Sequence, residues 1–140
     1  MTSIELSPAQ IPSLNELNSL LSKIEKETGI SIDHTTGDEI AYHLMRRIEL
    51  QHYAPRIMEL ATVIYDHCKG MAATEVMSDD RLLNLKADVQ RKWFDGKLAK
   101  WSALYNKSER ACKDLNSGID GLRSILSREK ELMRLTPNAA

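Results

Sequence analysis

The residues best suited to chemistry in this sequence are a few histidines, glutamates and cysteines on stretches with helical spacing. Glu49 and His52 form an E-x-x-H pair, which is half of the carboxylate–histidine motif of di-iron helical bundles. A complete site of that kind needs a second such motif and two further glutamates, and the sequence contains one copy. We therefore expect a solvent-facing pair here, with no metal and no cofactor.

The other candidate groups also favour ordinary structural roles. Glu39 and His43 are four residues apart, a spacing that stabilises a helix. His67 and Cys68 are adjacent, so their side chains point in different directions. The sequence contains neither of the two common glycine-rich phosphate loops and no G-x-S-x-G motif. These patterns predict a protein that is not an enzyme.

Residues 91–113 have a composition suited to a polyanion, with seven basic and two acidic side chains. The predicted DNA-binding residues are Arg91, Lys92, Lys97, Lys100, Lys107, Arg110 and Lys113. The interleaved aromatic residues are Trp93, Phe94, Trp101 and Tyr105. Aromatic rings that reach the surface could stack on the bases of a single strand. The alternative is a solvated basic face, with Trp101 and Tyr105 in the core.

The charge of the chain is divided between its two parts, although the net charge is only −1. Residues 1–80 carry six basic and thirteen acidic side chains, whereas residues 81–140 carry thirteen basic and seven acidic ones. Such a division indicates an anionic partner for the basic part. It is equally compatible with two parts that attract each other, within one chain or between copies.

The composition favours an all-α fold with long helices, because strong helix formers predominate and runs of alternating β-branched residues are missing. We divide the chain into an N-terminal arm with a short helix (residues 1–35) and a helical core (residues 36–140). Residues 1–12 are expected to form a loose arm. Ser13 and Glu16 form a capping-box pattern before a helix that ends near Thr28.

A second capping box, Thr36 and Glu39, predicts the start of the next helix. Pro55 should kink this helix, or break it and open a new one. Gly70 is expected to end the element, and residues 70–78 to form a connection. Asp79 lies within a run, residues 78–80, that suits the start of a long third helix.

That third helix contains a row of positions spaced by three and four residues, which is typical of heptad packing. The row consists of Leu98, Trp101, Tyr105, Ser108, Cys112, Leu115, Ile119, Leu122, Leu126, Glu129 and Met133. Gly118 and Gly121 lie within it; they allow close approach of another helix, or they end one helix and begin a hairpin.

A helix from Asp80 to Arg134 would be too long for the preceding helix to cover, so we expect burial against a second copy. A three-helix bundle within one chain is the alternative. The predicted oligomer interface consists of Leu98, Trp101, Tyr105, Leu115, Ile119, Leu122 and Leu126.

Cellular location follows from cysteine usage and hydropathy. Cys68 and Cys112 are too few for a disulfide framework and suggest reduced thiols in the cytoplasm. The N-terminus lacks the pattern of a signal peptide, and no apolar stretch is long enough to span a membrane. We expect a cytoplasmic protein, in the host cytoplasm if a phage encodes it.

The layout of residues 40–134 resembles the recombination mediators of large tailed phages, the UvsY family. The resemblance rests on an aromatic stretch ending at Gly70, an acidic connection at 78–80, a basic-aromatic helix through Trp101, and an Arg/Ile/Leu-rich stretch at 122–130. It implies a ring of helical protomers that binds single-stranded DNA. It also implies contacts with a RecA-like recombinase and a single-strand-binding protein, and no catalytic residues.

One departure from that family moves the expected DNA-binding site. The family has a short Lys/Arg motif before the aromatic-Gly turn, whereas residues 62–65 here contain no basic side chain. DNA binding is therefore expected from residues 91–113.

Two functions remain open: a single-stranded-DNA-binding mediator that helps load a RecA-like recombinase, or an oligomeric helical assembly protein without nucleic-acid binding. The second class includes phage structural or packaging components, chaperones and inhibitors.

Overall fold

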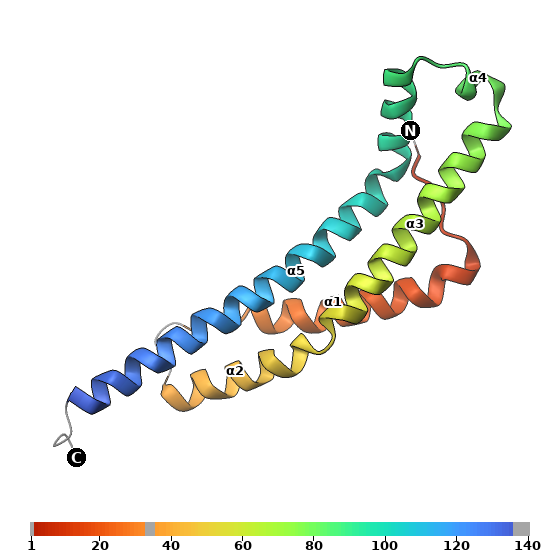
Figure 1. The fold of residues 1–140 in the computed structure, drawn as a ribbon. Coiled ribbons are helices and arrows are strands. Elements are labelled where there is room, and N and C mark those ends of the chain that lie inside the picture. The colour runs from red at the N-terminus through yellow and green to blue at the C-terminus, as the bar shows by residue number, and fades with distance from the viewer. Residues whose placement is uncertain (1, 33–35, 136–140) are drawn as a thin grey trace.

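The computed structural model describes residues 2–32 and 36–135, in which every regular element is a helix; this confirms the all-α class. A 3-10 turn, η1 (Pro8–Gln10), leads into α1 (Ile11–Thr28), and α2 (Gly37–Gln51) follows. The chain continues through α3 (Ala54–Ser78), α4 (Asp80–Leu83) and α5 (Ala87–Leu135). Figure 1 shows α5 running along the whole molecule, with α3 antiparallel to it at one end and α2 beside it at the other.

The first helix begins earlier than the sequence pattern indicated. Its first turn contains Pro12, and Ser13 makes no capping hydrogen bond, so the predicted Ser13–Glu16 capping box is wrong. Glu16 instead pairs with Arg56 of α3, whose two guanidinium nitrogens donate to its carboxylate at 2.8 and 2.9 Å. This pair lowers the pKa of Glu16. The predicted end of the helix near Thr28 is confirmed.

The start of α2 and the break before α3 follow the predicted chemistry. The Thr36 hydroxyl accepts a hydrogen bond from the Glu39 backbone N–H at 3.4 Å, which confirms Thr36 as the N-terminal cap. Of the two outcomes expected at Pro55, the structure shows the break: Pro55 lies in the first turn of α3. At this position its missing N–H costs nothing, because first-turn donors have no partner within the helix.

The predicted stop at Gly70 and the connection at 70–78 are wrong. α3 continues to Ser78, and Ala72 and Val76 are buried beyond the glycine. A glycine inside a helix costs about 1 kcal/mol relative to alanine. Burial of these two side chains in the same helix outweighs that cost.

The long third helix is interrupted near its predicted start. Asp79 does cap a helix, accepting from the Arg81 backbone N–H at 3.0 Å, but that helix is the short α4. Residues 84–86 separate it from α5. From there α5 continues through Gly118 and Gly121, so the alternative of a hairpin at these glycines is wrong.

The predicted row on α5 is confirmed as its inward face from Leu98 to Leu122. Its two polar members have local explanations. The buried Ser108 hydroxyl donates to the Leu104 carbonyl at 2.8 Å. Glu129 lies at the start of α2, since a Cβ placed on Gly37 would be 2.7 Å from its Oε2 atom. A carboxylate is favoured there by the helix dipole.

The expected loose arm at residues 1–12 is corrected by the structure for the part that it describes. Ile4 is buried, and the arm joins the same hydrophobic core as Leu17, Leu50, Ile64 and Leu115. The described part of the arm before α1 therefore packs onto the rest of the molecule. Met1 lies outside the described residues.

Candidate nucleic-acid interface

Residues 91–113 all lie on α5, so their side chains distribute around one helix. Leu98, Trp101, Ser108 and Cys112 occupy the side that packs on α1 and α3. Most of the predicted DNA-binding residues then fall on other sides of the helix, because the spacing between them is out of phase with the buried row. The helix therefore separates side chains that build the core from charged side chains at the surface.

Three of the seven predicted cations are held by carboxylates of the same chain. Lys97 lies 3.6 Å from Glu75 of α3, and Lys107 lies 3.3 Å from Glu25 of α1. Lys113 donates to Glu109 one turn away at 2.8 Å, which raises the pKa of Lys113. The pairs made by Lys97 and Lys107 join the basic part to the acidic part. Attraction within one chain, one of the two interpretations of the charge division, therefore occurs.

The other four cations, Arg91, Lys92, Lys100 and Arg110, are exposed and form no ion pair within residues 2–32 and 36–135. The Lys100 ammonium lies 4.9 Å from the centre of the Trp101 ring, against its face. From Arg91 to Arg110 the helix rises by about 28 Å at roughly 1.5 Å per residue. We call these four residues the open cation set.

The aromatic residues of the segment do not form a surface platform for bases. Trp101 is 3% exposed, and its indole N–H donates to the Ile4 carbonyl at 2.7 Å. Tyr105 is half-buried against Tyr65, with ring centres 5.7 Å apart. The rings of Trp93 and Phe94 pack edge to face with their centres 5.3 Å apart, and both side chains are half-buried against the core. The alternative that Trp101 and Tyr105 are core residues is thus the one that the structure supports.

Most of the predicted interface residues on the row are buried within a single chain. Five of them are buried by their own chain: Leu98, Trp101, Leu115, Ile119 and Leu122. Tyr105 and Leu126 are half-buried. Because α1, α2 and α3 of one chain all contact α5, most of this row is buried without a second copy, and its role as an oligomer interface stays a prediction.

The side chains considered for metal binding or catalysis, among them Glu49, His52 and the two cysteines, do not form a common site among the described residues. Glu49 and His52 are both exposed, and Glu49 pairs with Arg46 at 3.4 Å. Within the part of the chain that the structure describes, no three histidine, cysteine or acidic residues are grouped to hold a metal ion. Burial raises the pKa of both thiols, that of Cys68 to about 11, which makes them poor nucleophiles at neutral pH.

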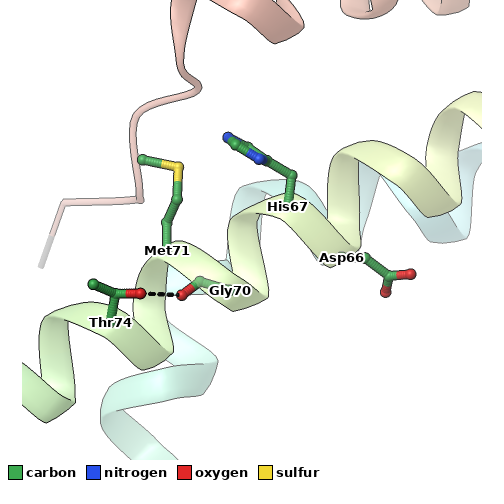
Figure 2. A pocket seen from close by; sticks show the side chains of 5 residues that line it. All are labelled: Asp66, His67, Gly70, Met71 and Thr74. Carbon is green, nitrogen blue, oxygen red and sulfur yellow. Dashed lines mark hydrogen bonds between the residues drawn. The ribbon is translucent and has the colours of Figure 1, made fainter.

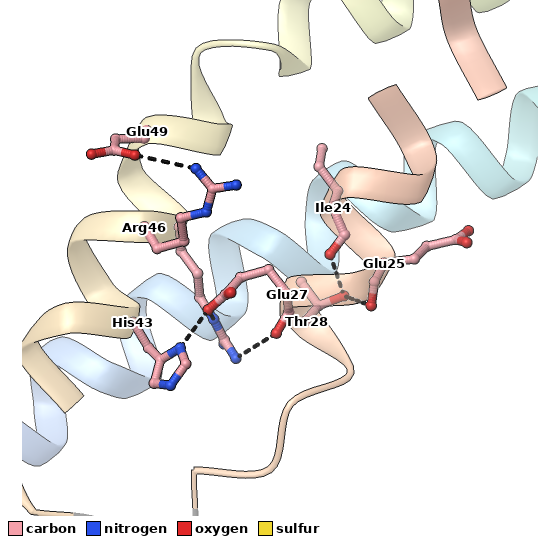
Figure 3. Close-up of polar contacts among 8 residues, drawn as sticks. Ile24, Glu25, Glu27, Thr28, His43, Arg46 and Glu49 are labelled. Atoms are coloured by element: carbon pink, nitrogen blue, oxygen red, sulfur yellow. Dashed lines mark hydrogen bonds and ion pairs between the residues drawn. The ribbon is translucent and has the colours of Figure 1, made fainter. Parts of the chain in front are cut away.

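A buried polar cluster was missed by sequence reasoning. Figure 3 shows Glu27 of α1 and His43 of α2, whose Nδ1 atom lies 2.7 Å from a Glu27 carboxylate oxygen. The same carboxylate oxygen lies 3.7 Å from Nε of Arg47. The guanidinium of Arg47 also donates to the Glu27 carbonyl at 3.4 Å. Gly118 of α5 makes room for it, because a Cβ there would contact the guanidinium. The available signal was a glycine within the row and a basic residue seven positions after Ile40.

A shallow hollow lies on one side of α3, lined by Asp66, His67, Gly70, Met71 and Thr74 (Figure 2). The Thr74 hydroxyl donates to the Gly70 carbonyl at 3.0 Å, so its side chain is used within the helix. The Nε2 atom of His67 lies 3.0 Å from the Ser7 hydroxyl of the N-terminal arm. This hollow thus borders the attachment of the arm.

Comparison of the chain with protein-family models, curated proteins and solved structures yields no match. Among residues 2–32 and 36–135, no helix combines the length and apolar character needed to cross a bilayer.

Proposed function

We propose that this chain is a non-enzymatic protein that binds single-stranded DNA along α5 and acts as a recombination mediator, helping to load a RecA-like recombinase. The observation that carries the DNA-binding part is the open cation set: four exposed basic side chains on one helix without carboxylate partners among the described residues. Unpaired cations can neutralise phosphates and release their counterions without first breaking an ion pair.

The mediator part of the proposal rests on the resemblance of residues 40–134 to the phage recombination mediators. It includes contacts with a single-strand-binding protein as well as with the recombinase. Because the aromatic residues of the segment are buried or half-buried, we expect little stacking of bases on them. Binding is expected to depend mainly on phosphate contacts, and therefore to be nearly independent of base sequence.

The test replaces the open cation set with alanine and measures binding of a fluorescent oligo(dT) by anisotropy over a range of salt concentrations. The slope of log Kobs against log salt is negative, and each lost phosphate contact should make it shallower by about 0.7 for a single strand. A variant with Lys23, Lys26, Arg46 and Lys69 replaced by alanine is the matched control, because it removes the same charge from other exposed positions. Equal affinity in the two variants would contradict the proposed site.

Assembly without nucleic-acid binding is the second candidate function, favoured by exposed apolar side chains at one end of the molecule. Met77 is 76% exposed at the end of α3, and Leu83, Leu85 and Val89 are exposed around α4 and the start of α5. These residues are available to a partner or to another copy. Light scattering at low and high salt, with and without oligo(dT), separates the two functions. A molar mass larger than that of one chain and unchanged by oligo(dT) supports assembly without nucleic-acid binding.

A further inference from the structure

The N-terminal arm, residues 2–7, is fastened onto α5 by its backbone. The Ile4 N–H donates to the Lys97 carbonyl at 3.0 Å, and the Ile4 carbonyl accepts from the Trp101 indole at 2.7 Å. The side chain of Ile4 is buried beneath the arm. The arm therefore contacts α5 within the segment that carries the predicted DNA-binding residues.

The arm is also fastened to α3, at its other end, where the Ser7 hydroxyl meets His67. In Figure 2 the arm, in pale red, runs past the tip of the Met71 side chain of α3, which lines a hollow together with Ile4 and Glu5. Besides the buried Ile4, only Leu6 of the arm packs against the core. A segment with so few contacts is released at a much lower cost than the unfolding of the helices.

The arm places a negative charge among the cations of α5. Glu5 is exposed and borders two hollows, one that also contains Lys97 and one that also contains Lys100 and Trp101. A phosphate that approached Lys100 would meet this carboxylate, and like charges at close range repel. The docked arm also covers the only ring in the segment that lies against a cation of the open set.

We propose that residues 2–7 are a displaceable cover of the proposed DNA-binding segment of α5 at Lys100 and Trp101, so that arm docking and single-strand binding compete. This inference rests on the proposed DNA binding by α5. Release of the arm removes the Glu5 carboxylate from beside the exposed Lys100 and uncovers the indole of Trp101, whereas Lys97 stays paired with Glu75. The coupling is reciprocal. If the docked arm lowers the affinity for DNA by a given factor, bound DNA lowers the equilibrium constant for docking of the arm by the same factor.

The experiment combines amide hydrogen exchange with binding measurements on the full-length chain. Exchange of the Ile4 N–H, which is protected by its bond to Lys97, is measured with and without oligo(dT). Oligo(dT) affinity is then measured for Ile4→Ser, which loses the buried anchor, and for Ile4→Val, which keeps an apolar one. Circular dichroism verifies that both variants remain helical, and a chain lacking residues 2–7 provides a second form without the arm.

Competition predicts that oligo(dT) accelerates exchange at Ile4. It also predicts that Ile4→Ser and the shortened chain bind about threefold more tightly or better, whereas Ile4→Val binds like the wild type. Binding of oligo(dT) with unchanged or slower exchange at Ile4, and equal affinity in all forms, would overturn the cover while leaving the proposed function intact. Failure of every form to bind oligo(dT) would instead contradict the proposed function itself.

Discussion

The inward and outward faces of α5 are built from the same stretch of sequence but are constrained in different ways. On the inward face, Leu115 and Ile119 are enclosed by helices of the same chain, so their shape and volume are fixed by packing. On the outward face, Lys92 and Arg110 are exposed and form no ion pair among the described residues. The comparison teaches that the fold depends on one face and leaves the other free for a ligand.

The largest expected effect is on the inward face. Leu115→Ala should lower the free energy of unfolding by about 2–5 kcal/mol, because it leaves a cavity at a fully enclosed position. Urea denaturation followed by circular dichroism measures this loss. Ile125→Ala, at a position on α5 that is 38% exposed, is the control and should cost much less. Similar losses at both positions would mean that α5 is not packed as described.

The two glycines of α5 should respond in opposite directions to the same substitution. Gly118→Ala brings a Cβ against the Arg47 guanidinium, which is buried and can move aside only by giving up its contacts with Glu27, so it should destabilise the fold by about 1–3 kcal/mol. Gly121→Ala meets nothing within 4 Å and should stabilise it by about 1 kcal/mol, through helix propensity alone. Thermal unfolding of the two variants measures the difference, and stabilisation by both would remove Gly118 from the buried cluster.

A smaller effect is expected from pH at the thiol of Cys68, which α3 contributes to the core. Burial raises its pKa from about 9 to about 11, so the folded state keeps a proton that the unfolded state loses. The stability from this group is complete below pH 9 and is lost as the pH rises to 11. Urea denaturation at pH 8 and pH 10.5 should show a smaller decrease for Cys68→Ala than for the wild type; equal decreases would contradict this origin.

The smallest effect on stability is expected on the outward face. Arg110→Ala should change the free energy of unfolding by less than about 0.5 kcal/mol, because the side chain is exposed and has no ion-pair partner among the described residues. Chemical denaturation measures this value alongside oligo(dT) affinity. A large loss of stability would show that the outward face also contributes to the fold.

The sequence predicted the helical class, the start of α2 and the buried row of α5, because helical periodicity and caps are local signals. Thr36, Pro55 and the row from Leu98 to Leu122 all behaved as their patterns indicated. Gly70 did not, because the free energy gained by burying Ala72 and Val76 is larger than the free energy lost by placing a glycine inside a helix. The helix propensities of the residues around Gly70 do not reveal whether the residues after it are buried, so they could not predict where α3 ends.

The candidate site was less predictable, because it depends on contacts between distant residues. Sequence alone did not show that Lys97 and Lys107 would pair with carboxylates of α3 and α1. Nor did it show that Trp101 would be covered by an arm almost a hundred residues earlier in the chain. Such pairings depend on the tertiary arrangement, which residue spacing within one helix does not contain.

The most direct test of the central claim is chemical footprinting of lysines in the presence of single-stranded DNA. Acetylation of the protein with and without saturating oligo(dT), followed by mass spectrometry, reports which ammonium groups the strand covers. The account predicts protection of Lys92 and Lys100 on α5 and unchanged modification of Lys23 and Lys26 on α1, all four of which are exposed in the free protein. Unchanged modification of Lys92 and Lys100 in a complex that has formed, or protection confined to α1, would contradict it.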